Sequence, residues 1–153
     1  MGNELKVSAQ ARHGVESPMQ PSPPQPISLV ICDDVIRDPK TGKIHLIGWA
    51  SGLGVKSFPH TTALLNVFIG LTAAPSTHDG QVVLLAPDGQ RLFRSKSHGL
   101  KFTVPAPSIW ALFRLGPIRF PTPGVYRLQF LCDNQMLTER EILVRFKGAN
   151  GDV

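Results

Sequence analysis

The last part of the chain alternates between apolar and polar residues with a period of two. From Tyr126 to Cys132 every second residue is apolar, and Arg127 and Gln129 lie between them. The apolar positions of the return segment are Ile142, Val144 and Phe146. Such a pattern predicts a hairpin of two strands with one buried and one solvated face. Leu131 and Leu143 fall on the polar phase, which indicates either a bulge or a second packed surface.

Turn signals divide the rest of the chain into short strands. Asp-Pro-Lys-Thr-Gly at 38–42 predicts a turn with Gly42 at a positive φ, and the flanking apolar runs predict a hairpin from Ile27 to Trp49. A Pro-Asp-Gly turn at 87–89 predicts a second hairpin. The segment "TTALLNVFIGLTA" is apolar on both faces, which predicts a central strand. The segment 108–116 fits two helical turns or a strand, and the alternation of its apolar residues favours the strand.

The stretch "ASGLGVKS", residues 50–57, approaches the phosphate-binding pattern G-x-x-x-x-G-K-[ST]. That pattern requires Gly directly before the lysine, and here the residue is Val55. A phosphate-binding loop also opens a helix, whereas Phe58-Pro59 follows here and disfavours one. The two glycines indicate a bulge or close packing against a neighbouring strand. We therefore predict a strand and no nucleotide-binding site.

These elements together predict an all-β protein: one antiparallel β-sandwich, immunoglobulin-like in style. The sandwich is expected at residues 27–147, between a disordered Pro-rich N-terminal arm at 1–26 and a C-terminal tail at 148–153. Five of the ten residues in "SPMQPSPPQP" are proline, which excludes helix and ladder pairing. Such an arm serves as a spacer or as an SH3-type ligand, and the spacer is the commoner role.

Two segments resemble the ends of a known family. They are "CDDVIRDPKTGKIHLIGW", which starts at Cys32, and "FPTPGVYRLQFLCDNQMLTEREILV", which starts at Phe120. In a bacterial family of small uncharacterised all-β domains, a "CD" strand leads into a hairpin that ends in Gly-aromatic, "SFP" follows, and a closing hairpin begins "PG-x-Y". Residues 57–59 and 123–126 match the last two motifs, so the resemblance covers about Ile27 to Phe146. It implies an all-β domain of bacterial origin and no assigned activity.

Positive charge is concentrated in one stretch of the chain. There are 16 Lys and Arg against 11 Asp and Glu, a net charge of +5, and no acidic residue stands between Asp88 and Asp133. Basic and aromatic residues interleave there, as on surfaces that bind nucleic acid or other anions. Alternatively, the basic side chains are scattered over both faces of the sheets, and acidic residues from other parts of the chain balance their charge. The candidate anion- or partner-binding residues are Arg91, Arg94, Lys96, Lys101, Arg114 and Arg119.

The sequence offers no recognisable metal or cofactor site. Cys32 and Cys132 lack C-x-x-C spacing and the five histidines show no ligand spacing, so we expect no metal ligands and no cofactor. The cysteines are expected to be buried thiols, with a long-range disulfide as the alternative. Asp33 and Asp34 should point to opposite faces of a strand, and Asp38 should make a turn, so no shared ligand is expected.

The lack of membrane-spanning, secretion and catalytic patterns in the sequence limits the kinds of function that we expect. No apolar run approaches the roughly 20 residues of a spanning helix, and the N-terminus lacks the apolar part of a secretion signal, so a cytoplasmic location is expected. No catalytic set of acid, base and nucleophile can be assembled and no Ser/His/Asp order is legible, so the protein is not expected to be an enzyme. The sequence therefore indicates a non-catalytic module that binds an unknown protein partner. The alternative is a basic domain that binds nucleic acid or another anion through residues 89–132.

Overall fold

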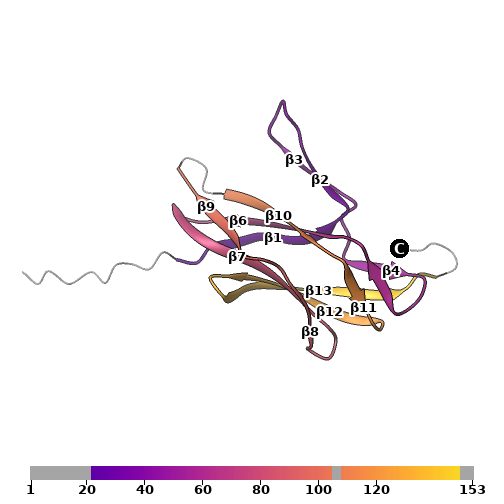
Figure 1. Cartoon of the computed structure of the whole chain (residues 1–153). Coiled ribbons are helices and arrows are strands. Elements are labelled where there is room, and N and C mark those ends of the chain that lie inside the picture. Colours follow the sequence, from indigo (N-terminus) through magenta and orange to yellow (C-terminus); the bar gives the residue numbers. More distant parts are fainter. Residues whose placement is uncertain (1–21, 105–107, 149–153) are drawn as a thin grey trace, which may run out of the picture.

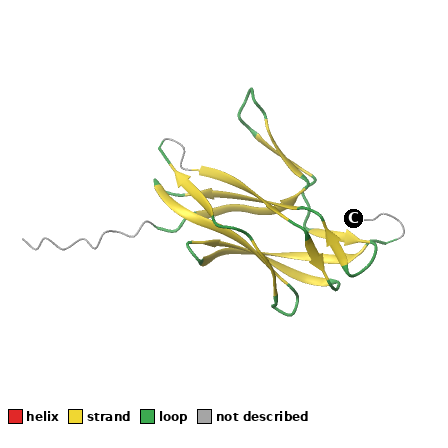
Figure 2. Ribbon diagram, viewed as in Figure 1, coloured by secondary structure: helices red, strands yellow, loops and turns green. Residues whose placement is uncertain are grey.

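The structure, a computed structural model, describes residues 22–104 and 108–148. Within these ranges the chain forms strands, turns and loops, and the main strands lie in two layers (Figures 1 and 2). Because the described residues contain no helix, they contain no helical segment able to cross a bilayer. The strands run from Gln25 to Phe146, against an expected span of 27–147. Most of the predicted Pro-rich arm (residues 1–21) and the end of the chain (149–153) lie outside the described residues.

Two sheets form the layers. The first comprises β1 (Gln25–Cys32), β6 (Leu65–Thr72) and β10 (Ser108–Leu115), in the order β1–β6–β10. The second comprises β4 (Gly52–Val55), β13 (Gln135–Phe146), β12 (Gly124–Cys132), β7 (Ser76–Leu85) and β8 (Arg91–Arg94), in that order. β9 (His98–Phe102) also pairs with β7. These pairs are antiparallel, except that β4 runs parallel to β13.

Two small ribbons complete the fold. β2 (Asp34–Arg37) and β3 (Ile44–Ile47) form a hairpin that projects from the sandwich (Figure 1). β5 (His60–Thr62) pairs with β11 (Ile118–Phe120). A second apolar cluster, separate from the main core, holds the projecting hairpin to the first sheet. Its members are Val30, Cys32 and Phe68 of the sheet and Val35 and Ile44 of the hairpin.

The main core lies between the two sheets. Alternate residues of the two central strands face it and are completely buried: Val67, Ile69 and Leu71 on β6, and Tyr126, Leu128 and Phe130 on β12. Full burial of one such side chain contributes about 1.5–3 kcal/mol. The period-two prediction is thus confirmed for β12. It is wrong for Phe146, which is 59% exposed at the end of β13 and meets Phe58 edge-on at 4.9 Å.

The neighbours of each central strand follow the immunoglobulin pattern. β6 lies between β1 and β10, and β12 lies between β7 and β13, as strands B and F lie between A and E and between C and G in immunoglobulin domains. Near the start of β12, the hydroxyl of Tyr126 donates to the carbonyl of Thr122 at 2.5 Å. A tyrosine in this place with this bond is a hallmark of the immunoglobulin sandwich. The predicted fold class is therefore confirmed.

The structure also confirms the predicted turns and strands. Gly42 and Gly89 adopt positive φ angles of 70° and 87° in the two predicted turns. A register shift between Phe130 and Leu131 marks a bulge, and β10 forms the strand expected at 108–116. The stretch that approaches a phosphate-binding loop contains strand β4. Gly52 reflects close packing, because a Cβ there would overlap the backbone of β13.

The predicted hairpin from Ile27 to Trp49 is wrong in its first strand. β1 pairs with β6, and the hairpin is confined to β2 and β3. Leu29 and Ile31 of β1 face the main core, and pairing with the exposed β3 would leave their apolar surface in water. The chain bends at Asp33, whose amide donates to the carbonyl of Ile47 at 2.8 Å. Local turn chemistry sets the ribbon, and burial sets the partner of β1.

Substituting Tyr126→Phe should lower the free energy of unfolding by about 1–2 kcal/mol. Phenylalanine keeps the buried ring, which packs edge-on against Phe120 at 5.1 Å, but it removes the hydroxyl that donates to the carbonyl of Thr122. Urea denaturation followed by tryptophan fluorescence measures the loss. Thr122→Ala is the control, because it keeps the carbonyl and should change stability by less than about 0.5 kcal/mol. Equal losses in the two variants would contradict this account.

Candidate functional sites

The basic residues predicted as a binding surface are exposed and come from four strands and one connecting segment. Arg91 and Arg94 lie on β8, Lys96 lies in the segment after it, and Arg119 lies on β11. The guanidinium of Arg94 is engaged within the domain, because it donates to Oε1 of Gln81 at 2.6 Å. These four residues lie outside the clefts described below.

On the outer face of the second sheet, where Arg91 lies, negative charge partly balances the positive charge. The register places Arg91 opposite Leu85 of β7, and Leu85 opposite Arg127 of β12. Arg127 in turn lies 3.9 Å from the carboxylate of Glu139 on β13. The charge that looks uniform along the sequence is therefore mixed on this face.

Lys101 and Arg114 do come together, at a cleft of about 770 Å³ between β9 and β10. Trp110 lines the same cleft, is 42% exposed, and stacks on Phe68 with ring centroids 6.0 Å apart at an interplanar angle of 19°. An indole that is packed on one side and open on the other can stack a planar group. Two neighbouring cations would attract an anion to it. The cleft therefore suits a planar, anionic ligand.

The projecting hairpin exposes large apolar side chains. Ile36 and Ile47 lie on the same face of the hairpin and are 48% and 44% exposed, and Trp49 just beyond β3 is 57% exposed. We name these three residues the ribbon surface. The opposite face carries Val35 and Ile44, which pack on the first sheet. One face of the hairpin is thus anchored and the other is open.

A second cleft, of about 460 Å³, lies beside β4. Trp49 lines it together with Leu143 of β13, which is 45% exposed, and with the basic residues Arg145 and Lys147. The ribbon surface therefore continues at Trp49 into an apolar cleft that carries positive charge.

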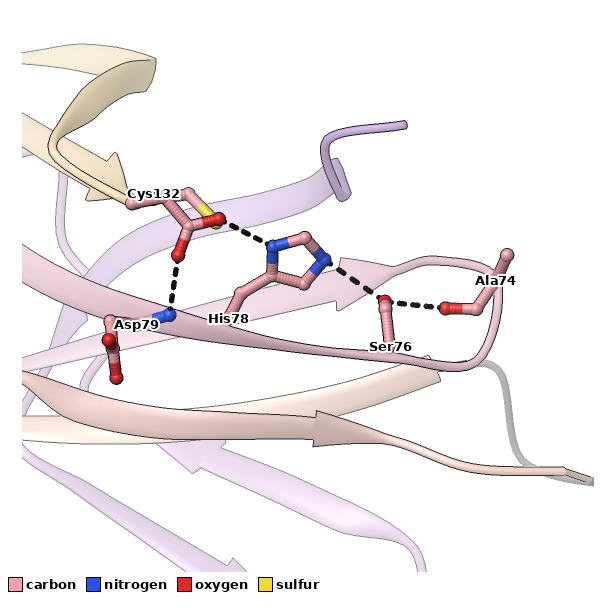
Figure 3. Close-up of polar contacts among 6 residues, drawn as sticks. Ala74, Ser76, His78, Asp79 and Cys132 are labelled. Atoms are coloured by element: carbon pink, nitrogen blue, oxygen red, sulfur yellow. Dashed lines mark hydrogen bonds and ion pairs between the residues drawn. The ribbon is translucent and has the colours of Figure 1, made fainter. Parts of the chain in front are cut away.

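A polar network joins β7 to the turn between β12 and β13 (Figure 3). Nδ1 of His78 lies 2.6 Å from Oδ2 of Asp133, and Nε2 lies 3.0 Å from Oγ of Ser76. The hydroxyl of Ser76 donates to the carbonyl of Ala74 at 2.7 Å. The amide of Asp79 donates to the other carboxylate oxygen of Asp133 at 2.9 Å. The network ties together two hairpins that are distant in the sequence.

Sequence reasoning missed this network. His78 and Asp133 are 55 positions apart, and only the pairing of β7 with β12 brings them into contact. A local signal was present: Asp133 and Asn134 adopt φ angles of 50° and 64°, a conformation that Asp and Asn tolerate in two-residue hairpin turns. Ser76 and His78 also share one face of a strand.

The order Ser76–His78–Asp133 resembles the nucleophile, base and orienting acid of a hydrolase. The hydrogen bonds do not favour catalysis, because the carbonyl of Ala74, 2.7 Å from Oγ of Ser76, competes with the imidazole for the single hydroxyl hydrogen. The side chain of His78 is also only 4% exposed, so substrate has little access to it.

Two groups beside His78 have pKa values shifted in opposite directions. The hydrogen bonds from His78 and from the amide of Asp79 lower the pKa of Asp133. Burial, reinforced by the charges of Asp133 and Asp79, raises the pKa of the Cys132 thiol to about 11. Sγ of Cys132 lies 4.0 Å from Oδ2 of Asp133. Three atoms able to ligate a metal, one each from His78, Cys132 and Asp133, therefore lie within 4.8 Å of one another.

Both cysteines are buried free thiols, as expected, and the alternative of a disulfide is not realised. Cys132 belongs to the main core, whereas Cys32 belongs to the apolar cluster beneath the projecting hairpin. Burial, together with the neighbouring carboxylates Asp33 and Asp34, raises the pKa of Cys32.

The acidic residues near β2 serve the local backbone. The carboxylate of Asp38 accepts from the amide of Lys40 at 2.8 Å and from the hydroxyl of Thr41 at 2.9 Å, and these bonds lower its pKa. This confirms its turn-making role. Asp34 accepts from the adjacent amide of Val35 at 2.8 Å.

Comparison with known proteins assigns a family without an activity. A family model described as a family of unknown function (DUF6941) matches residues 27–145. Among curated proteins, no sequence matches this chain.

Two solved structures are similar to this chain at low sequence identity. One is the Pseudomonas fluorescens alkylpurine DNA glycosylase AlkC bound to DNA containing an abasic site analog, with 14% identity and a TM-score of 0.42. The similarity covers 76% of this chain but only 30% of the glycosylase chain. The other is an immunoglobulin-like protein from Pseudomonas aeruginosa, with 14% identity and a TM-score of 0.34, covering 77% of this chain and 97% of that one.

Substituting Asp133→Asn should lower stability near neutral pH, and the loss should shrink in acid. Asparagine tolerates the positive φ of this turn, but an amide cannot accept from both His78 and the amide of Asp79 as a carboxylate does. Because the folded-state pKa of Asp133 is lowered, its stabilisation is present above an unfolded-state pKa of about 3.9 and is lost as pH falls through the folded-state value.

Urea unfolding of wild type and variant between about pH 3 and about pH 7 measures this difference. Asp79→Asn is the matched control, because it removes an exposed charge while keeping the amide that bonds to Asp133. A difference that grows on acidification, or an equal effect in the control, would contradict the assignment.

Proposed function

This chain belongs to DUF6941, a family of unknown function, and we propose from its own surface that it is a non-catalytic module that binds a protein partner. The observation that carries the proposal is the ribbon surface. Ile36, Ile47 and Trp49 are each 44–57% exposed on or beside a hairpin that projects from the sandwich (Figure 1). Exposed apolar patches on small domains mark interaction sites, since they cost solubility without adding to the core.

The ribbon surface suits a partner with an apolar face. The hairpin is held in place by Val35 and Ile44, so little conformational freedom is lost on binding. Trp49 is the natural anchor, since tryptophan is enriched among residues that dominate binding energy. Arg145 and Lys147, which line the adjoining cleft, favour acidic residues at the border of the partner's apolar face.

The absence of catalysis and a cytoplasmic location are part of this proposal. The competition of the Ala74 carbonyl for the Ser76 hydroxyl hydrogen and the burial of His78 support a non-catalytic role. Two buried free thiols are in keeping with a reducing compartment. The bacterial origin implied by the family resemblance stays a prediction.

Substituting Ile36→Asp together with Ile47→Asp should abolish partner binding and leave the fold intact. Both side chains are about half exposed, so each substitution should change the free energy of unfolding by less than about 1 kcal/mol. Two charges inside an apolar interface should raise the dissociation constant at least about 30-fold.

Proteins captured from a lysate of the source organism by the wild type, but not by the variant, identify the partner. Isothermal titration calorimetry with the purified partner then measures the change in affinity. Val104→Asp is the control, because Val104 is 77% exposed and lies outside the ribbon surface. Equal binding by wild type and ribbon variant, or equal loss in the control, would refute the proposal.

The second candidate function is binding of nucleic acid or another anion, and a specific observation favours it. Of the six basic residues predicted from the sequence, Lys101 and Arg114 line one cleft with the half-open indole of Trp110. Aromatic stacking beside cations is how many domains hold single-stranded nucleic acid. This cleft, and not the whole acid-free stretch, is the candidate surface.

Substituting Lys101→Ala together with Arg114→Ala should weaken binding of a labelled single-stranded oligonucleotide, as measured by fluorescence anisotropy at low and at physiological salt. The loss of two phosphate contacts should reduce the slope of log affinity against log salt by about 1.4. Arg91→Ala with Arg119→Ala removes equal charge outside the cleft and should have little effect. If the wild type does not bind the oligonucleotide at low salt, this second candidate function is refuted.

A further inference from the structure

The ring of His78 lies among polar groups that come from two hairpins. Its Nδ1 lies 2.6 Å from Oδ2 of Asp133, and its Nε2 lies 3.0 Å from Oγ of Ser76, which is also 2.7 Å from the carbonyl of Ala74. Sγ of Cys132 lies 4.0 Å from the same oxygen of Asp133. One ring nitrogen therefore faces a carboxylate and a thiol, while the other is held by a hydroxyl.

We propose that this position binds a divalent metal ion of the zinc class, with Nδ1 of His78, Sγ of Cys132 and the carboxylate of Asp133 as ligands. These three atoms lie within 4.8 Å of one another, near the start of β7, at the last residue of β12 and in the turn that follows β12. An imidazole nitrogen, a thiolate and a carboxylate form a donor set that zinc accepts and that hard cations such as magnesium do not. The site is independent of the proposed partner binding.

Small movements would bring the ligands to tetrahedral geometry. In a zinc site the nitrogen and oxygen ligands are about 3.3 Å apart and sulfur and oxygen about 3.6 Å apart, as follows from the usual bond lengths. Here the first pair is 2.6 Å apart and the second 4.0 Å apart. Asp133 can make both adjustments, because its side chain is 55% exposed and lies in a turn. His78 and Cys132 are buried and hold their places.

The surroundings already orient the ligands as the outer shell of a metal site does. Nε2 of His78 is bonded to Ser76, which is bonded to Ala74 (Figure 3). The amide of Asp79 holds one oxygen of Asp133. Metal-ligating histidines and carboxylates are commonly oriented by such bonds, which set the tautomer and the direction of the lone pair. The exposed side of Asp133 leaves a route for the ion and a fourth position for water.

Metal binding balances as an exchange of one proton for the ion. The proton on Sγ leaves to solvent and a sulfur–metal bond replaces it. The hydrogen of a neutral imidazole lies on Nε2, where it can donate to Oγ of Ser76, so that the lone pair of Nδ1 is free to bind the metal. Burial is the main reason that the pKa of the Cys132 thiol is raised, and the charges of Asp133 and Asp79 add to it. A bound divalent cation would be attracted by these two charges and would stabilise the thiolate.

Titration of the full chain with Co²⁺, after removal of bound metal with a chelator, tests the proposal. Cobalt stands in for zinc and gives an absorption band from thiolate to metal when sulfur is a ligand. The wild type should show this band and lose it when Zn²⁺ is added in equal amount to the protein. Cys132→Ser should abolish the band, and Asp133→Asn should weaken cobalt binding at least about tenfold.

Cys32→Ser is the matched control, because it removes the other buried thiol, which lies in a different cluster, and should leave the band unchanged. Absence of the band in the wild type overturns the proposal without any variant, so the test does not depend on Cys132→Ser being able to fold. A band that persists in folded Cys132→Ser, or is lost in folded Cys32→Ser, overturns it as well. Circular dichroism establishes that each variant is folded.

Discussion

The burial of alternate apolar residues from β6 and β12 in one core is the constraint on which the rest of the structure depends. Val67, Ile69 and Leu71 from one strand and Tyr126, Leu128 and Phe130 from the other leave no face of the main core open to water. Once these faces are buried, the other strands must pair at their edges. Because of this constraint, β1 pairs with β6 and not with the adjacent β2–β3 ribbon. It also sets the immunoglobulin-like order of strands.

The same constraint places the three candidate sites at the margins of the sandwich. The β2–β3 hairpin is joined to the outside of the first sheet, and Ile36 and Ile47 stay exposed on its other face. The cleft with Trp110 lies where β9 and β10, from different sheets, approach each other. The network of His78 lies where β7 meets the turn after β12. Each site combines an element anchored in the core with a segment that the core does not use.

The candidate sites differ in how far the sequence could predict them. The basic stretch was visible in the sequence, but its charges come from several strands, and the sequence did not show that Lys101 and Arg114 line one cleft with Trp110. The turn role of Asp38 was predictable, because an aspartate bonds to the backbone within its own turn. The contact of His78 with Asp133 was not predictable, because no local sequence pattern determines which strands become neighbours in the fold.

The sequence by itself determined the strand class, the turns and the buried phase of β12, because these follow from the period of apolar residues and from the backbone preferences of Gly, Pro and Asp. It also indicated two buried thiols. Only the tertiary structure decided the partner of β1, the exposure of Phe146 and the meeting of Lys101 and Arg114 at one cleft. It alone assembled Ser76, His78, Cys132 and Asp133. The reason is physical: a strand's own pattern tells which face is buried, whereas its neighbours are chosen by the total apolar surface that the whole chain removes from water.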